Sequence, residues 1–293
     1  MKIYKLVIIN IFLITTIFYS CSVRKNILIV QLMSKHNAKY WFNDKEEITF
    51  CHAIEWGDTR KMGKMLKEGI KLNKQGNTGM TFLLYSYLKS NKKSYKYLLE
   101  NGADPDIEMY ASEKLEFQST MNFTVSVMSF AANEYNDSYY LEKALSHGGN
   151  PNTYISGRHI LYYAVDSTDI NNVKLLIESG ADPDGLKEKD QEEHSTPLSF
   201  SIEDDDYYIA YYLLQKGADP EISKTDIIYH IYNHNLENST ASEKLKEYQK
   251  KVIKMLEERG FDFSPQNIQK IEEERHNKSI ENIEELKTSI GTK

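Results

Sequence analysis

The sequence predicts an all-α solenoid of about five or six helix–turn–helix repeats, each with a hairpin-like tip. Three observations indicate this fold. The tetrapeptide GADP occurs three times, and the near copy GGNP occurs once. An amphipathic segment ending in glycine precedes each copy. The glycines are spaced by about the length of one helix pair, as a repeat array requires.

The glycines that close the repeats show the period most clearly. They are Gly69, Gly102, Gly148, Gly180, Gly217 and Gly260, separated by 33, 46, 32, 37 and 43 residues. Glycine adopts the left-handed conformation that ends a helix at little cost, and a proline shortly after it cannot continue the helix. We therefore expect each GADP to end one helix pair and to start the turn toward the next.

One segment, TPLSFSIEDDDYYIAYYLLQKGADPE at residues 196–221, contains a complete unit. Thr196 suits the N-cap of a first helix, and Pro197 suits its first position. The unit resembles the ankyrin repeat, in which a threonine–proline–leucine start leads through two helices to glycine–alanine–aspartate. Weaker copies lie at residues 53–73, 79–106, 128–152, 157–184 and 227–263. The resemblance covers about residues 48–263 and implies an ankyrin-repeat domain there.

Both flanks of this domain lack the repeat pattern. Residues 22–47 are expected to form a tether or N-terminal cap, in which NILIVQLM either packs on the first repeat as a short helix or continues the tether. Residues 264–293 place apolar side chains mostly three or four apart among charged ones, which predicts one amphipathic capping helix or two. An insertion at residues 109–122 precedes the third repeat, next to a hairpin tip.

Residues 1–21 have the organisation of a secretory signal. Two lysines precede an uncharged run at residues 6–19, which is shorter than the roughly 20 residues of a spanning helix. The end of this segment, IFYSC, resembles the lipobox of bacterial lipoproteins, although Phe18 and Tyr19 are bulkier than usual. The resemblance implies lipidation at Cys21 and, because Ser22 is not aspartate, anchoring at the outer membrane of the cell envelope. An ordinary cleaved signal with an incidental Cys21 is the alternative.

Composition and cysteine content limit the remaining choices. The chain has 293 residues, of which 40% are hydrophobic and 27% charged, so it is long and apolar enough to fold without disulfides. Its net charge of −7 argues against nucleic acid as the main partner. Cys51 is the only cysteine besides Cys21, and it lies in an apolar stretch typical of a buried thiol.

The sequence contains no recognisable catalytic set and predicts no cofactor or metal. The motifs HExxH, GxSxG, CxxC and the P-loop are all absent. Histidines such as His147 and His159 fall at repeat turns, and the acidic run at residues 203–206 lacks the alternating ligands and central glycine of a calcium loop. We therefore expect a protein that is not an enzyme and acts through a surface.

The ankyrin resemblance implies which surface that is. In this family the concave face, formed by hairpin tips and by exposed positions of the first helices, contacts other proteins. Carried onto this chain, the positions expected to bind a partner are Glu55, Trp56, Lys89, Glu108, Tyr110, Glu134, Tyr135, Tyr154, Asp166, Glu203 and Asp204. The set is rich in acids and aromatics, which favours a basic or mixed-charge protein partner. Six further tyrosines, at positions 162, 163, 207, 208, 211 and 212, are expected mostly to pack between helices.

The resemblance to bacterial ankyrin-repeat lipoproteins suggests a function. Some such proteins are immunity proteins that bind and block a toxic phospholipase effector of type VI secretion in the periplasm. The expectation is an envelope-anchored inhibitor of this kind. A periplasmic scaffold for an envelope enzyme, an enzyme with an unrecognised site and an exported protein acting on host proteins are the alternatives.

Overall fold

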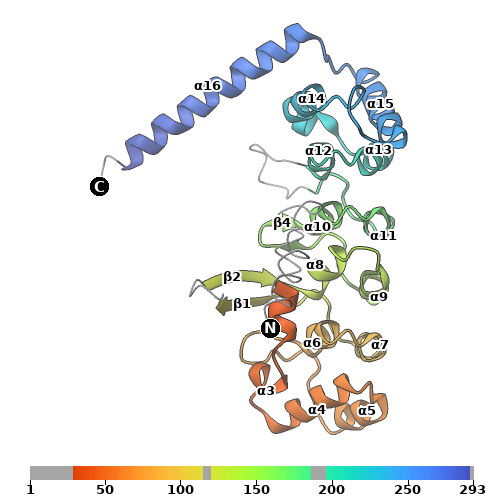
Figure 1. The fold of residues 1–293 in the computed structure, drawn as a ribbon. Helices are drawn as coiled ribbons and strands as arrows, with labels where there is room; N and C mark the ends of the chain where they lie inside the picture. Colours follow the sequence, from red (N-terminus) through yellow and green to blue (C-terminus); the bar gives the residue numbers. More distant parts are fainter. Residues whose placement is uncertain (1–28, 115–119, 186–195, 291–293) are drawn as a thin grey trace, which may run out of the picture. The chain divides into compact units, whose positions relative to one another are not determined.

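The computed structural model describes residues 29–114, 120–185 and 196–290, and antiparallel helix pairs make up most of it (Figure 1). The predicted fold class is confirmed in both compact units of the chain, which are Met1–Gly185 and Leu186–Lys293. Cys21 lies outside the described residues.

The first unit contains four helix pairs. They are α4 (Lys45–Glu55) with α5 (Thr59–Lys67), α6 (Phe82–Leu88) with α7 (Lys92–Glu100), α8 (Val127–Ala132) with α9 (Tyr139–Ser146), and α10 (Ile160–Asp166) with α11 (Ile170–Glu178). The first helices contact one another in chain order, and so do the second helices. The row of second helices lies on one side of the unit and the hairpins lie on the other (Figure 1).

The second unit contains the last two pairs and the C-terminal helix. The pairs are α12 (Pro197–Glu203) with α13 (Tyr207–Gln215), and α14 (Lys224–Asn233) with α15 (Glu243–Glu257); the 3₁₀ helix η1 (Pro220–Ser223) joins them. Residues 265–290 form the single helix α16 (Pro265–Ile290), which packs on α14 and buries Ile268 and Ile271. Arg275 of α16 pairs with Asp226 of α14, so the last pair is covered on its outer side.

The repeated GADP turn follows from three local interactions. Gly102 has a φ of +90°, which closes α7, and the amide of Ala103 then donates to the Leu98 carbonyl at 3.0 Å. The carboxylate of Asp104 accepts a hydrogen bond from the amide of Asp106 at 2.9 Å, so the side chain forms an Asx turn across the intervening proline. The same side-chain turn occurs at Asn150, Asp182, Asp219 and Asp262. Each residue type in GADP thus has a separate structural role.

Two asparagines connect these turns to their neighbours. Asn73 donates to the Gly102 carbonyl at 3.1 Å and accepts from the Asp104 amide at 2.9 Å. Asn152 makes the same two contacts with Gly180 and Asp182, at 2.9 and 2.7 Å. Because each asparagine satisfies one backbone donor and one acceptor of the following turn, it fixes the stacking of adjacent repeats.

The insertion before the third repeat forms an antiparallel hairpin of β1 (Met109–Lys114) and β2 (Thr120–Val125), in which Met109 pairs with Val125. Met109 and Val125, the residue pair at the base of the hairpin, are both buried. Gln75 donates to the Glu108 carbonyl at 2.7 Å beside β1, and Ser156 donates to the Thr124 carbonyl at 3.4 Å beside β2. Ser156 belongs to the short hairpin of β3 (Tyr154–Ile155) and β4 (Arg158–His159), so the neighbouring tips hold the base of the inserted hairpin.

The N-terminal segment, residues 29–43, covers the first helix of the second repeat. All seven residues of α6 are buried, as expected of a helix that is apolar on every side. Phe42 stacks on Phe82 of α6 with ring centroids 4.8 Å apart. Within this segment α3 (Ala38–Trp41) buries Ala38 and Trp41, and the helical turns before it bury Ile29 and Met33. NILIVQLM therefore ends in a helix that is packed against the repeats in its described part.

The turns between the paired helices of the first five repeats each contain one residue with positive φ. In the first repeat it is Gly57, whereas the fourth repeat has Thr168 with a φ of +55°. A β-branched residue is strained in this conformation because its side chain crowds the backbone. The Thr168 side chain is exposed, so nothing in the described structure offsets this strain.

Thr168→Gly is therefore expected to raise the free energy of unfolding by about 1 kcal/mol, because glycine relieves the strain and no buried contact is lost. Urea unfolding of the purified protein measures the change. The reverse substitution at the equivalent turn, Gly57→Thr, is the matched control and should lower stability. An unchanged or lower stability for Thr168→Gly would show that the turn is not strained.

Candidate functional site

Several of the predicted partner-binding residues lie at the ends of the first helices of the repeats in the first unit. Three of the acids there are engaged in contacts between repeats. Glu55 accepts a hydrogen bond from the Tyr85 hydroxyl of the next repeat, and Glu134 accepts one from the Tyr87 hydroxyl of the preceding repeat. These two acids are partly buried, so their first role is to hold adjacent first helices together.

Asp166 requires a correction. It is only 3% exposed, and its carboxylate accepts a hydrogen bond from Asn133 of the preceding repeat at 3.0 Å. The same asparagine donates to the Tyr163 carbonyl at 2.9 Å. A buried carboxylate in this position cannot contact a partner protein; it orients Asn133 between two repeats instead.

Lys89 is also occupied within the chain. Its ammonium donates to the carbonyls of Ser34 and His36, at 3.0 and 2.9 Å, and lies 5.3 Å from the centre of the Tyr85 ring. These carbonyls follow the helical turns of the N-terminal segment, where a cation stabilises unsatisfied acceptors. Lys89 therefore fastens the N-terminal segment onto the repeats.

Exposed side chains remain at six predicted positions in two groups. In the first unit, Trp56 is 85% exposed, Tyr110 65% and Tyr135 50%, and Glu108 is exposed beside Tyr110. In the second unit, Glu203 and Asp204 are exposed at the end of α12. Tyr154 is half-buried and packs edge-on against His159, with ring centroids 5.1 Å apart. The structure thus leaves six of the eleven predicted residues exposed, counting both acids of the second unit.

The two tyrosine–glutamate contacts differ in their electrostatics. Burial opposes ionisation of Glu55, but hydrogen bonds from Tyr85 and His52 outweigh it and lower the pKa of this carboxyl below its usual value. Burial dominates at Glu134 and raises its pKa, with Asp137 adding to the rise, although the Tyr87 hydroxyl acts in the opposite direction. Two similar contacts therefore favour opposite charge states.

His159 has a structural role in the fourth repeat. It stands where threonine or serine caps the first helices α6, α8 and α12, and its Nδ1 accepts from the Leu161 amide at 3.2 Å. That contact places the ring proton on Nε2, which lies 3.1 Å from the side-chain oxygen Oδ1 of Asn152. Burial lowers the pKa of His159 to about 4, although Asp182 acts in the opposite direction. The neutral imidazole thus connects a helix cap to the asparagine that holds the next turn.

The acidic run at residues 203–206 is explained by the turn that it forms. Asp204 is the C-cap of α12, Asp205 has a φ of +57°, and Asp206 caps α13 by accepting from the Ile209 amide at 3.2 Å. Among the described residues no group of acids, histidines or cysteines could hold a metal ion. Cys51 is buried, and burial raises the pKa of its thiol.

Several tyrosine side chains pack between helices, and some of them also contact lysine side chains. In the second unit Tyr207 is fully buried, and Tyr208 and Tyr211 contact Tyr248 of α15 with centroids 4.8 and 5.6 Å apart. Lys251 lies 4.6 Å from the centre of the Tyr248 ring. Tyr162, Tyr163 and Tyr212 are partly buried. These tyrosines belong to the packing of the helices.

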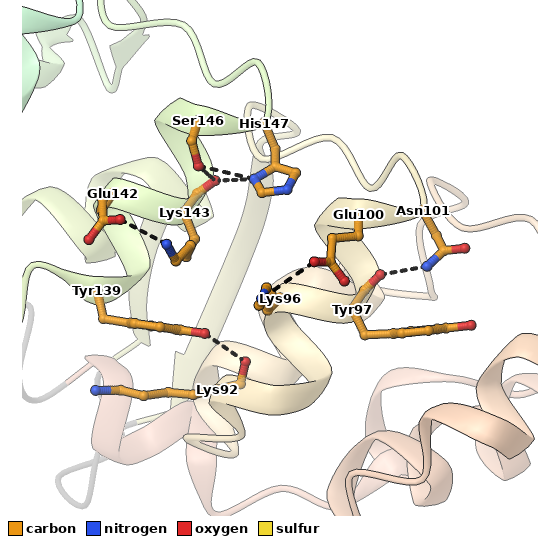
Figure 2. A network of polar contacts seen from close by, with 10 residues as sticks. All are labelled: Lys92, Lys96, Tyr97, Glu100, Asn101, Tyr139, Glu142, Lys143, Ser146 and His147. Atoms are coloured by element: carbon orange, nitrogen blue, oxygen red, sulfur yellow. Dashed lines mark hydrogen bonds and ion pairs between the residues drawn. The ribbon is translucent and has the colours of Figure 1, made fainter.

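Figure 2 shows a polar network on the second helices of the first unit, which sequence reasoning did not single out. Lys92 of α7 lies 4.8 Å from the centre of the Tyr139 ring of α9, and the Tyr139 hydroxyl donates to the Lys92 carbonyl at 3.3 Å. Lys96 pairs with Glu100 at 3.5 Å. The sequence signal for this surface is the concentration of lysines in KKSYKYLLE of α7 and in TRKMGKMLK of α5.

Across the described segments, no helix is long and apolar enough to cross a membrane. The candidate site is a surface on stacked helix pairs, with exposed aromatics at hairpins and turns.

Comparison with known proteins identifies the fold. Residues 127–224 match the family model of ankyrin repeats in three copies. The chain is similar to the crystal structure of an ankyrin repeat domain from Acinetobacter baumannii AYE, with a TM-score of 0.52 and 19% identity over 70% of this chain and 98% of the other. It is also similar to the ankyrin repeat domain of Bcl-3, a member of the IkappaB family, with a TM-score of 0.52 and 17% identity over 70% and 85%.

The curated proteins contain no significant match to this sequence. The chain carries ankyrin repeats and has the ankyrin-repeat fold. Ankyrin-repeat domains are typically non-catalytic modules that bind other proteins.

The electrostatics of His159 predict a pH dependence of stability. Its pKa is lowered from 6.5 to about 4 by folding, so the unfolded chain binds a proton that the folded chain excludes between these values. Stability should be complete above pH 6.5 and fall as pH decreases toward 4, with a loss of about 2 kcal/mol at pH 5. His159→Thr, which restores the usual cap, should remove this loss in urea unfolding.

The control for this experiment is His276→Thr, which removes an exposed imidazole and should leave the pH dependence unchanged. Equal acid sensitivity of the wild type and His159→Thr would contradict the assigned role.

Replacement by glutamine is expected to change stability in opposite directions at Glu134 and Glu55. Glutamine keeps an acceptor for the tyrosine hydroxyl but removes the charge. Because the pKa of Glu134 is raised, its contribution to stability is largest at acidic pH and is lost as pH rises through its folded value. Glu134→Gln should therefore increase stability at pH 7, by about 1 kcal/mol at most.

Because the pKa of Glu55 is lowered, its contribution is present above the unfolded value and is lost as pH falls. Glu55→Gln should therefore decrease stability at pH 7. Unfolding curves of both variants at pH 7 and pH 4.5 test the pair, since each is the other's control. Changes of the same sign at pH 7 would refute the assignment.

Proposed function

We propose that this chain is a non-enzymatic protein that binds another protein through the hairpin side of its ankyrin repeats. The observation that carries the proposal is the inserted β1–β2 hairpin. Its base is buried between neighbouring tips, whereas Tyr110 beside that base is 65% exposed. A tyrosine held on a fixed base loses little conformational freedom when it contacts a partner, which is why tyrosine is enriched at binding hot spots.

Exposed acids in each of the two units favour a partner with basic groups. Glu108 is exposed next to Tyr110, and Glu203 and Asp204 are exposed at the end of α12. Exposed acids speed association with a positively charged partner and make it sensitive to salt. Glu134 and Asp166 do not contribute contacts of this kind, because both are committed to neighbouring repeats.

We place the protein in the bacterial cell envelope, anchored through Cys21 to the outer membrane on its periplasmic side. This proposal rests on residues 1–21, which combine two lysines, an apolar run and a final cysteine. Replacement of Cys21 by serine, followed by fractionation of the cells, tests it. Membrane attachment of Cys21→Ser that persists unchanged after a high-salt wash, which removes electrostatic binding, would exclude a lipid anchor.

The finer proposal is an immunity protein that binds and inhibits a toxic secreted effector of the phospholipase type. It is supported by the resemblance to ankyrin-repeat lipoproteins, by the anchor and by a sequence without a catalytic set. The anchor would hold the inhibitor at the membrane that such a toxin attacks. A periplasmic scaffold that binds or protects an envelope enzyme is the alternative outcome.

The decisive experiment is a pull-down of the tagged full chain from cells that also express the neighbouring genes, read by mass spectrometry. A stoichiometric lipase-like partner, whose toxicity the chain relieves, is the expected result. Recovery of resident envelope proteins alone, with no protection from any neighbouring gene product, would reject immunity and leave the scaffold.

Tyr110→Ala should weaken the complex about 10- to 100-fold, because it removes an aromatic anchor without disturbing a buried contact. Isothermal titration with the captured partner measures the loss. Tyr232→Ala is the matched control, since Tyr232 is 43% exposed on α14, away from the hairpins of the first unit in sequence.

Glu203→Lys with Asp204→Lys should slow association at low salt. Equal affinities of all these variants would place the binding surface elsewhere.

A further inference from the structure

The second helices of the first two repeats carry a concentration of positive charge. Helix α5 has Arg60, Lys61, Lys64 and Lys67 and no acid within its bounds. Helix α7 has Lys92, Lys93 and Lys96 and one acid, Glu100. The cationic residues are all exposed, and α5 and α7 are neighbours in the stack. We call this surface the basic face; it belongs to a chain whose net charge is −7.

The basic face ends at the second repeat. Helix α9 has one lysine and one glutamate, and α11 likewise has one of each. Lys92 of α7 pairs with Asp137, just before α9, at 2.6 Å. Within α9, Lys143 pairs with Glu142 at 2.8 Å, as Figure 2 shows. The positive charge is thus confined to one end of the row of second helices.

Most of the charge on this face is not neutralised by neighbouring acids. Lys64 and Lys96 pair with Glu68 and Glu100 one turn away, at 3.6 and 3.5 Å. Such exposed pairs contribute little to stability. Four cations have no ion pair with any residue that the structure describes: Arg60, Lys61, Lys67 and Lys93. Four unneutralised cations on adjacent helices repel one another, so a bound anionic surface would stabilise them.

An exposed tryptophan borders the basic face. Trp56 is the C-cap of α4 and directly precedes the turn into α5, and its side chain is 85% exposed. A Cβ at Gly57, the next residue, would lie 3.6 Å from Cδ of Lys93, so the stem of Lys93 lies beside this turn. Indole has an apolar ring and one polar N–H, a combination favoured at the boundary between lipid and water.

We propose that the basic face and Trp56 together bind the surface of an anionic phospholipid bilayer. Each lysine or arginine near such a surface strengthens binding several-fold, and an aromatic at the boundary adds apolar contact. The two adjacent helices present their cations from one row, which suits a flat layer of phosphates better than the shaped site of one acidic protein. The inference needs neither the lipid at Cys21 nor the proposed partner protein.

Binding through this face would orient the first unit. The second helices lie on one side of the unit and the β1–β2 hairpin lies on the other (Figure 1). With α5 and α7 at the bilayer, the β1–β2 hairpin lies on the side away from it. The membrane contact and the proposed protein contact therefore use different surfaces and do not compete.

Vesicle binding of the full chain tests the proposal. The probes are vesicles of phosphatidylcholine alone and of phosphatidylcholine mixed with phosphatidylglycerol, at low and high salt. Because the N-terminal apolar run is the same in every sample, only differences between vesicles and between variants are interpreted. We expect stronger binding to the anionic vesicles at low salt, and a loss of about a hundredfold or more when Arg60, Lys61, Lys67 and Lys93 are replaced by glutamate.

The matched control replaces four exposed lysines of the second unit, Lys216, Lys250, Lys254 and Lys270, by glutamate, which changes the net charge equally. Equal losses for the two charge variants, or equal binding of the wild type to both kinds of vesicle, would overturn the proposal. Retention of the wild type on immobilised polyglutamate but not on anionic vesicles would also overturn it, and would assign the face to an acidic protein.

Tryptophan fluorescence gives an independent readout. The chain has two tryptophans, and Trp41 is buried while Trp56 is exposed. Anionic vesicles should shift the emission of the wild type to shorter wavelength, because the Trp56 indole leaves water. Trp56→Phe should abolish that shift and weaken binding several-fold. A shift that persists in Trp56→Phe would contradict insertion of this side chain.

Discussion

Every helix pair in this protein depends on its neighbours, because a pair this short cannot bury its own apolar face. The clearest case is α6, whose seven residues are all buried. The paired helix α7 covers one side of α6, and α4 and α8 cover two more. The N-terminal segment also covers α6, through Phe42 and the contacts of Lys89. The segment before the repeats is therefore part of the core, and removing it would expose an apolar helix.

The same dependence decides which polar side chains are buried in contacts between repeats. Glu55, Glu134 and Asp166 stand near first-helix ends, as Glu203 and Asp204 do, and the repeat pattern alone treats these positions alike. The first three meet Tyr85, Tyr87 and Asn133 of adjacent repeats, whereas the last two are exposed. The partners lie about 30 to 47 positions away in the chain. Such contacts cannot be read from spacing within one repeat.

Local chemistry made most of the fold predictable. Glycine with positive φ and the Asx turn of aspartate or asparagine act within a few residues, so GADP indicated both the helix ends and the turns. The hairpin at β1–β2 was visible only as an insertion, because its position depends on Gln75 and Ser156 in neighbouring tips. The basic face was missed for a related reason: a net charge of −7 conceals seven cations that only the stacking of α5 on α7 brings together.

That separation of charge has a physical consequence for a protein at a membrane. A chain with net negative charge is repelled by an anionic bilayer in most orientations, since the long-range interaction follows the total charge. Within about a Debye length, roughly 8 Å in physiological salt, the local charge dominates instead. An orientation that brings α5 and α7 to the surface would replace repulsion by attraction. The net negative charge of the chain would then favour approach through the basic face over orientations that present its acids to the lipid.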